Sequence, residues 1–275
     1  MKQVMAPLGM AALFVVSQCI AAVVAPSFKS EGFETFENPN DPVNIFYIFS
    51  VIIIFTALIL FIAKYKEDFV KYIILFSFFL ASLSIFDAFF YLLVPSLSSV
   101  IAIFVAIIMI ILIIRHPEWY VVDLFGVFLA GGIAALFAIS LSLELILIFL
   151  IVLAAYDAIS VYKTKHMVRL AETITSSHLP LLLMVPKNTT FSYRKLKKLG
   201  RKRDAVYMGL GDFIIPGWLI AYASVELGFI GFFITLVGAL VGYVVLMALV
   251  SRGPQPGLPL LNGGAITAFA LIYWL

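Results

Sequence analysis

The chain has 275 residues, of which 64% are hydrophobic and only 12% are charged. Soluble domains carry about 25% charged residues, so this composition excludes an ordinary soluble protein and predicts one that lies largely in lipid. The formal net charge is only +3, so the charge balance does not indicate a nucleic-acid partner. The single cysteine, Cys19, excludes an internal disulfide framework and a cysteine-rich metal site.

Apolar runs long enough to cross a bilayer recur along nearly the whole chain. Each has about 18 or more residues between breaks formed by charged residues, proline or glycine, and such a run spans a hydrocarbon core about 30 Å thick as a helix. The sequence therefore predicts an all-α fold, a polytopic transmembrane helix bundle of about nine spans. The predicted spans cover residues 4–25, 44–63, 72–94, 97–114, 120–139, 144–162, 205–224, 228–250 and 258–275.

The first range, residues 4–25, also resembles a signal peptide. Lys2 precedes an apolar stretch that ends in Val23-Val24-Ala25, as in a cleavable leader. The stretch is long for a leader, however, and Pro26 would follow the cleavage site directly. We therefore expect a membrane span here and keep the cleaved leader as the alternative.

The basic residues between the predicted spans lie almost entirely on one side of the bundle. If the loops alternate between the two sides, only Lys29 falls on the other side. Cytoplasmic loops carry an excess of lysine and arginine, so the N-terminus and loop 163–203 are predicted to be cytoplasmic and the C-terminus extracytoplasmic. The residues on the basic side are Lys2, Lys64, Lys66, Lys71, Arg115, every basic residue from Lys163 to Arg203, and Arg252.

The long basic loop divides the chain into three parts. Residues 1–162 are predicted to form an N-terminal bundle of six spans, residues 163–203 the cytoplasmic loop, and residues 204–275 a C-terminal bundle of three spans. The loop ends in a run of basic residues between Arg194 and Arg203. We interpret this run as a positive-inside anchor with attraction to anionic lipid, and keep a docking surface for a partner as the alternative.

Ionisable residues within membrane spans require an explanation, because each costs on the order of 3 kcal/mol at a helix centre. Asp87 lies toward the outer end of the third predicted span, and Asp123 lies near the cytoplasmic start of the fifth. We expect Asp87 to accept an interhelical hydrogen bond and Asp123 to lie at the membrane interface. A functional role is the alternative for both residues.

Two further aspartates lie where they could meet. Asp157 is late in the sixth predicted span, and Asp212 is about two turns into the seventh. The sixth span approaches the cytoplasm and the seventh leaves it, so both carboxyl groups are predicted at a similar depth on antiparallel helices. Gly209 and Gly211 should allow another helix to approach Asp212 closely, and the Pro216-Gly217 pair predicts a kink one turn further on.

A pair of facing carboxyl groups can carry out acid–base chemistry without a metal or an organic cofactor. In a low dielectric the two groups tend to share one proton, because both cannot be ionised cheaply. The ionised group can take a proton from an attacking water while the protonated group donates to the carbonyl oxygen of the substrate. The same two residues could instead join helices or bind a proton or cation in a carrier, and their spacing alone leaves these alternatives open.

Three motifs resemble those of a known family. Tyr156-Asp157 and Gly209-Leu210-Gly211-Asp212 resemble the YD and GxGD motifs of the presenilin and signal peptide peptidase aspartyl proteases. Pro256-Gly257-Leu258-Pro259 resembles the family's Pro-Ala-Leu motif, with Gly257 in place of alanine. The order of the motifs, the long loop between the aspartates and the number of spans are also similar, so the resemblance covers the whole chain.

The resemblance implies an intramembrane aspartic endopeptidase in which Asp157 and Asp212 are catalytic. It implies single-pass transmembrane proteins as substrates, a lipid bilayer as surroundings, and no cofactor, metal or nucleic acid. The loop charges favour the presenilin orientation, and the lack of large hydrophilic regions indicates a compact microbial homologue that acts without presenilin's partner subunits. Whether copies of the chain form oligomers is left open.

The remaining motif residues are expected to shape the site. Tyr156, the Gly209-Leu210-Gly211 segment and the Pro256–Pro259 segment would lie near the aspartates by the same resemblance. The prolines should keep the backbone before the last span extended, where it could pair with an unwound substrate segment. Asn262, Gly263 and Gly264 are expected to serve tight helix packing and one interhelical hydrogen bond, with direct contact to the substrate as the alternative.

Other functions compete with this interpretation. A prepilin-peptidase-like protease also uses GxGD and two aspartates, but the Pro-Gly-Leu-Pro segment and the absence of a Cys-x-x-Cys pair weigh against it. A channel or ion-coupled carrier could use Asp157 and Asp212 as an ion site, but it predicts internal repeats that the sequence does not show. A third alternative is an inactive relative that only binds membrane helices.

Overall fold

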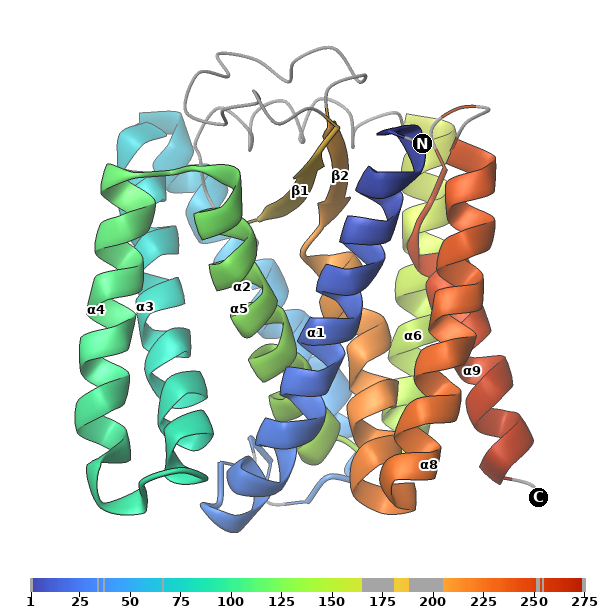
Figure 1. Cartoon of the computed structure of the whole chain (residues 1–275), viewed down its shortest axis with the longest axis horizontal. Coiled ribbons are helices and arrows are strands. Elements are labelled where there is room, and N and C mark those ends of the chain that lie inside the picture. Colours follow the sequence, from blue (N-terminus) through green and yellow to red (C-terminus); the bar gives the residue numbers. More distant parts are fainter. Residues whose placement is uncertain are drawn as a thin grey trace.

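The chain forms a helix bundle with a two-stranded antiparallel sheet at one end (Figure 1). The basic run between Arg194 and Arg203 lies outside the residues that the structure describes. The computed structural model describes residues 2–33, 35–36, 38–65, 67–164, 181–187, 205–250, 253 and 255–273.

Most of the described residues are helical. The sheet consists of β1 (Leu182–Pro186) and β2 (Ala205–Gly209), and a π-helical turn, η2 (Ser160–Thr164), follows α6 directly. The helices are α1 (Lys2–Ser30), α2 (Val43–Tyr65), α3 (Glu67–Tyr91), α4 (Ser98–Arg115), α5 (Trp119–Ser140), α6 (Leu143–Ile159), α8 (Gly211–Val250) and α9 (Leu258–Tyr273), with a short 3-10 helix at Pro95–Leu97.

The helices have the lengths and composition of membrane spans. Among the described residues, six helices are long and apolar enough to cross a bilayer, and α9 and the described part of α2 are shorter apolar helices. Every span predicted from the sequence overlaps one of the helices listed above, and the seventh and eighth predicted spans both overlap α8. A multi-pass integral membrane protein follows from this arrangement.

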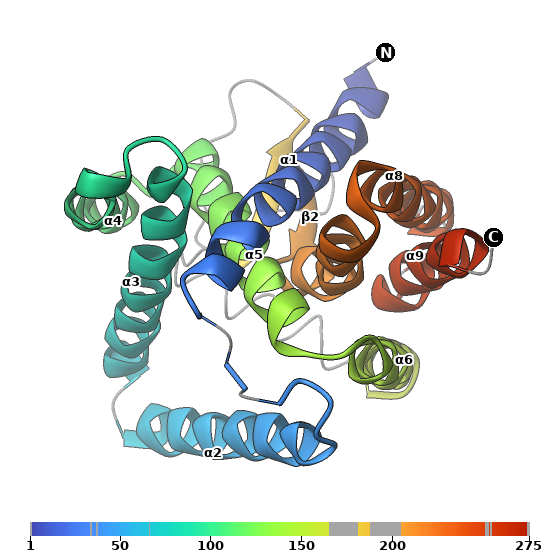
Figure 2. The same cartoon turned by 90° about the horizontal axis from the view of Figure 1, so that it is seen from below.

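Helix α8 is divided into two helices at Gly228. This glycine has φ 68° and ψ −156°, a conformation that only glycine adopts without strain. Figure 2 shows the two halves of α8 side by side, so the chain reverses at this residue. The predicted boundary between spans 205–224 and 228–250 is therefore confirmed, whereas the helical backbone continues through Pro216.

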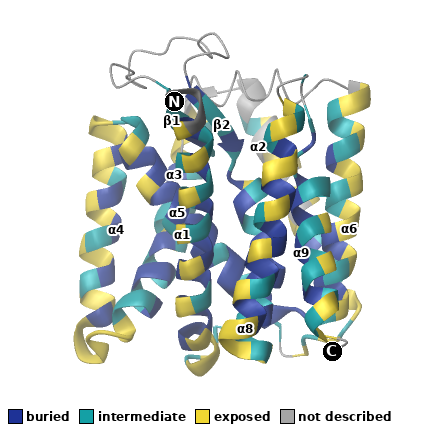
Figure 3. Ribbon diagram, turned by 45° about the vertical axis from the view of Figure 1, so that its right-hand side comes forward, coloured by how far each residue is buried: buried dark blue, intermediate teal, exposed yellow. Residues whose placement is uncertain are grey.

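The interior of the bundle is built around α1, α5 and α8. Figure 3 shows their inner faces buried, while the outer helices, α4 among them, present exposed positions to the outside. Phe14 of α1 and Phe213 of α8 are fully buried, and their ring centroids are 5.5 Å apart. The range that imitates a signal peptide is thus part of the core.

The seventh span was predicted to start as a helix at residue 205, and this start is wrong. Residues 205–209 form strand β2, which pairs with β1 so that Tyr207 lies opposite Met184, and α8 begins only at Gly211. Valine and tyrosine favour a strand where a partner is available, and that partner lies within loop 163–203, far away in the sequence. Asp212 consequently lies in the first turn of α8 instead of two turns inside a helix.

The two ends of the chain lie at opposite ends of the bundle. The N-terminus is at the end that carries the sheet, and the C-terminus is at the other end (Figure 1). Strands β1 and β2 therefore lie on the side of the N-terminus.

Candidate active site

Asp157 lies near the end of α6, inside the bundle. Helix α6 begins after Ser142, whose hydroxyl caps it by accepting a hydrogen bond from the backbone N–H of Leu145 at 3.5 Å. Asp157 is only 3% exposed. Its Oδ2 accepts a hydrogen bond from the backbone N–H of Leu258 at 3.1 Å, which holds the start of α9 against α6.

Asp212 contacts the residue next to this bond. A Cβ atom on Gly257 would lie 3.1 Å from Oδ1 of Asp212, and one on Gly209 would lie 3.4 Å from its Oδ2. Gly257 and Leu258 are consecutive, so one short segment touches both carboxyl groups. Asp157 also acts on Asp212 electrostatically, as expected of two acidic groups that share a site.

The Pro-Gly-Leu-Pro segment has the backbone that its prolines predict. Residues 255–257 are not helical, and α9 begins at Leu258. Pro259 falls in the first turn of α9, where a missing N–H does not break a helical hydrogen bond. The structure therefore brings together five of the predicted site residues: Asp157, Gly209, Asp212, Gly257 and Leu258.

Other predicted site residues lie beside this group without pointing into it. Tyr156 is 68% exposed, so its side chain faces outward although Asp157 next to it faces inward. Leu210 is buried, and its N–H donates to the carbonyl of Leu181 at 3.0 Å, which extends the sheet toward Asp212. Gly211 is exposed.

The close helix approach predicted at Gly209 and Gly211 occurs elsewhere. A Cβ on Gly211 would meet only Cδ1 of Ile215, at 3.9 Å. A Cβ on Gly217 would instead lie 2.7 Å from Oε1 of Gln18 and 2.8 Å from the Cβ of Ala134. The prediction was wrong because Gly209 belongs to a strand, and α1 and α5 meet α8 at Gly217, six residues after Gly211.

Gln18 is a residue near the site that the sequence interpretation did not single out. It is fully buried in α1, and its Nε2 donates to the carbonyl of Phe213, next to Asp212, at 3.0 Å. An amide within an apolar span is itself a signal, because such groups usually hydrogen bond to another helix. Gln18 thus ties the first turn of α8 to α1.

Tyr162 and Gln255 form another contact that was not predicted. Tyr162 lies in the π-helical turn after Asp157, and its hydroxyl donates to Oε1 of Gln255 at 2.8 Å. π-Helical turns interrupt the regular path of a helix and often occur at functional sites. The contact joins the segment that follows Asp157 to the segment that precedes Gly257.

Asp87 and Asp123, the two other aspartates within predicted spans, have different environments. Asp87 accepts hydrogen bonds from Ser99 Oγ at 3.1 and 3.3 Å, so the predicted interhelical bond between α3 and α4 is confirmed. The prediction that Asp123 lies at the membrane interface is wrong. Asp123 is 2% exposed, and its Oδ1 accepts a hydrogen bond from the backbone N–H of Met184 at 2.8 Å, because β1 folds over the start of α5.

Helix α9 packs as its sequence predicts. Nδ2 of Asn262 donates to the carbonyl of Leu150 on α6 at 2.9 Å, which is the predicted interhelical bond. Gly264 lies against the backbone of Gly238 on α8, so the tight packing is also confirmed. For Gly263 the same prediction is wrong, because nothing lies within 4 Å of its Cβ position.

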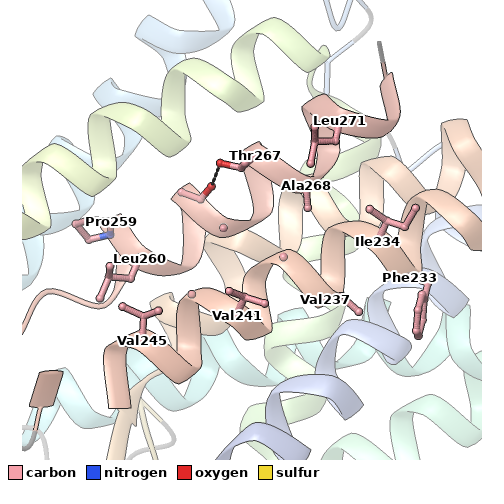
Figure 4. Close-up of a pocket in the computed structure, with 14 residues that line it drawn as sticks. Phe233, Ile234, Val237, Val241, Val245, Pro259, Leu260, Thr267, Ala268 and Leu271 are labelled. Atoms are coloured by element: carbon pink, nitrogen blue, oxygen red, sulfur yellow. Dashed lines mark hydrogen bonds between the residues drawn. The ribbon is translucent and has the colours of Figure 1, made fainter. Parts of the chain in front are cut away.

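An apolar groove lies outside this group of residues, between the second half of α8 and α9. It has a volume of about 610 Å³. Figure 4 shows Val237 and Val241 on its α8 side and Pro259 and Leu260 on its α9 side, with Thr267 bonded within α9. Neither Asp157 nor Asp212 lines it, so this groove is separate from the two carboxyl groups.

The arrangement of Asp157 and Asp212 is suited to proton transfer and hydrolysis. Two carboxyl groups that interact in a poorly solvated interior cannot both be ionised cheaply, so one can act as a base while the other acts as an acid. Among the described residues, no group of three or more His, Cys, Asp or Glu side chains could hold a metal ion.

The comparisons with known proteins extend over nearly the whole chain. The family model described as signal-peptide peptidase, presenilin aspartyl protease matches residues 11–274. Two solved structures, each of a presenilin family intramembrane aspartate protease, are 30% and 32% identical, with TM-scores of 0.71 and 0.73. They cover 96% of this chain in both cases, and 95% and 96% of their own chains. No curated protein sequence matched.

Proposed function

Because the chain belongs to the signal-peptide peptidase and presenilin family, and is thus an intramembrane aspartyl protease, we propose that Asp157 and Asp212 are its catalytic pair. One observation carries this assignment. The carboxyl group of Asp157, on α6, accepts a hydrogen bond from Leu258, and that of Asp212, on α8, lies against the preceding residue, Gly257. If the aspartates served only to join α6 to α8, each would bond to the helix of the other, and neither would need the segment Gly257-Leu258.

The proposed mechanism uses the pair as a unit. The ionised carboxylate takes a proton from a water molecule as the water attacks the scissile carbonyl, and the protonated partner donates to the carbonyl oxygen. The roles are exchanged when the tetrahedral intermediate collapses and the leaving amine takes a proton. The N–H of Leu258 orients Asp157 throughout, and the small Gly257 leaves room for the carboxyl group of Asp212.

The substrate is proposed to be a single-pass transmembrane segment that unwinds beside the pair. A helix has no free backbone N–H or C=O to offer, so a peptide bond must leave the helical state before water can attack it. The exposed Tyr156 and Gly211 directly precede Asp157 and Asp212 in the sequence and give the segment a place to approach. Leu210 and the segment Pro256–Pro259 shape the site around it.

The topology follows from the loop charges. We propose about nine spans with a cytoplasmic N-terminus, a cytoplasmic loop 163–203 and an extracytoplasmic C-terminus. The three parts of the chain are 1–162, 163–203 and 204–275, with one catalytic aspartate in each bundle part. The N-terminus and the sheet lie at the same end of the bundle, which supports this orientation.

The test is cleavage of a reconstituted single-pass substrate by the purified protein. We expect the wild-type protein to cut, and Asp157→Ala and Asp212→Ala each to be silent while retaining the elution profile and helical content of the wild type. Asp87→Ala is the matched control, because it removes an aspartate that bonds to a neighbouring helix far from the pair in sequence. Cleavage that survives at either position would overturn the assignment of the pair.

The alternatives are not favoured. A carrier or channel, or a prepilin-peptidase-like enzyme, would not explain a family match from residue 11 to residue 274 together with the fold of presenilin family proteases. The carrier would be favoured again if variants of Asp157 and Asp212 still cut the substrate but no longer supported ion flux in liposomes.

A further inference from the structure

Asp123 is a buried acidic residue that the proposed mechanism does not use. It lies in the first turns of α5 and is 2% exposed, and Oδ1 accepts a hydrogen bond from the N–H of Met184. Its Oδ2 is buried without a hydrogen-bond partner. Placing a carboxyl group in an apolar interior is costly, so a valine or leucine would serve packing alone better.

The hydrogen bond between Met184 and Asp123 lies on the edge of β1 that faces away from β2. Met184 lies opposite Tyr207 in the β1–β2 pair, and its N–H is directed to Asp123 instead of to β2. Met184 is fully buried and packs with Val122 in a small cluster beside the main core. Asp123 therefore takes the place of a neighbouring strand, and without it a buried N–H would lose its acceptor.

The same face of α5 also fixes β1 by packing. Gly126 lies one turn after Asp123, on the same side of the helix. A Cβ on Gly126 would come within 2.5 Å of Cδ2 of Leu183, the neighbour of Met184 in β1, so the strand lies directly on the helix here. Asp123 and Gly126 together set the position of β1 along α5.

The sheet in turn leads directly to a catalytic residue. Strand β2 ends at Gly209, which lies against the carboxyl group of Asp212, and the N–H of Leu210 bonds to Leu181 at the end of β1. A shift of β1 along α5 would therefore move β2 and the first turn of α8. Misplacement of a catalytic group by about 1 Å can cost about a hundredfold in rate.

We propose that Asp123 is a positioning residue that fixes the β1–β2 sheet on α5 and thereby sets the place of Asp212 relative to Asp157. It touches neither the substrate nor the catalytic pair. The proposal rests on the proposed function of Asp157 and Asp212. Its contribution is the acceptor oxygen for Met184, not a negative charge.

The test compares substitutions that keep or remove this acceptor. Asp123→Asn retains a carbonyl oxygen of the same reach, and we expect it to keep at least half of the wild-type kcat. Asp123→Leu and Asp123→Ala lack the acceptor, and we expect kcat to fall tenfold or more while KM stays within about threefold. In amide hydrogen exchange, Met184 should lose protection in the apolar variants and keep it in Asp123→Asn.

Matched controls decide whether the effect is specific. Asp87→Leu removes another hydrogen-bonded carboxyl group, between α3 and α4, and should leave kcat within twofold of the wild type. The proposal is wrong if Asp123→Leu cuts at the wild-type rate, if Asp123→Asn is as impaired as Asp123→Leu, or if Asp87→Leu is equally impaired.

The same measurements test the proposal when the apolar variants do not fold and when the wild-type protein does not cut. If neither apolar variant can be purified in a folded state, Asp123→Asn decides, and loss of either its activity or its Met184 protection contradicts the proposal. If the wild-type protein itself does not cut, the proposed function fails first. Exchange along residues 205–212 then still tests whether Asp123 orders the segment before Asp212.

Discussion

Gly257 lies against the carboxyl group of Asp212, so that a Cβ at this position would come 3.1 Å from Oδ1 and 3.2 Å from Cγ. Contacts this short require the neighbouring group to move by a few tenths of an ångström. The neighbour is a proposed catalytic side chain, and it cannot move without a change in the geometry of the pair. The departure of this chain from the family's Pro-Ala-Leu motif thus has a measurable consequence.

For Gly257→Ala we expect a fall in kcat of a few-fold with little change in stability. For Gly257→Val, whose branched side chain would displace Asp212 further, we expect a loss of about a hundredfold. The measurement is cleavage of the reconstituted substrate at saturating concentration. Gly263→Ala is the control, because nothing lies within 4 Å of its Cβ position. Equal rates for Gly257→Val and the wild type would contradict this prediction.

Removal of the Gln18 amide should loosen the first turn of α8. Gln18→Met keeps the length of the side chain but leaves the carbonyl of Phe213 without this donor. Interhelical hydrogen bonds in membrane proteins contribute about 0.6 kcal/mol on average and up to about 1.7 kcal/mol, so we expect a destabilisation in this range. Unfolding in mixed detergent measures it.

The control for Gln18 is Thr267→Val, since Thr267 bonds only within its own helix, to the carbonyl of Gly263. This variant should unfold as the wild type does. If Gln18→Met were as stable as the wild type and cut at the same rate, the bond to Phe213 would have no role in holding α8.

The reversal of the chain at Gly228 should tolerate no side chain. The residue combines φ 68° with ψ −156°, a conformation that costs other residues about 1–3 kcal/mol. We expect Gly228→Ala to lower the thermal unfolding temperature although nothing lies within 4 Å of its Cβ position. Ser224→Ala, one turn earlier on a helical backbone, should have no such effect. A Gly228→Ala protein of unchanged stability would mean that the turn is not held in this conformation.

The proposed orientation can be measured by labelling single cysteines. In a Cys19→Ser background, a cysteine placed at Lys187, beside the sheet, should react with an impermeant thiol reagent only from the cytoplasmic side. A cysteine placed at Asn40, in the connection between α1 and α2, should react only from the opposite side. The reverse pattern would contradict the orientation read from the loop charges.

The parts of the fold that the sequence predicted are those that depend on local chemistry. The spans were found because a run of apolar side chains can satisfy its backbone in lipid only as a helix. The bonds of Asp87 and Asn262 were expected because a polar group inside a span needs a partner on another helix. The reversal at Gly228 was placed correctly because the apolar runs break there.

The parts that were missed depend on contacts between distant segments. Residues 205–209 were predicted as helix because hydropathy does not reveal a strand partner in another segment. That partner is residues 182–186. Asp123 was expected at the interface because nothing in its own span shows that β1 covers the start of α5. Gln18 carried a signal, an amide in an apolar run, but its partner lies 195 residues further along the chain.

The sequence by itself determined that this is a multi-pass membrane protein, and its three motifs were enough to recognise an intramembrane aspartyl protease family. Each of these features lies within a single span or a short segment, so composition and residue order are enough to predict it. Only the tertiary structure decided that Gly257 and Leu258 meet both aspartates, that a small sheet precedes Asp212, and that α5 holds this sheet. Such contacts join segments far apart in sequence, and they follow from packing, which no single segment specifies.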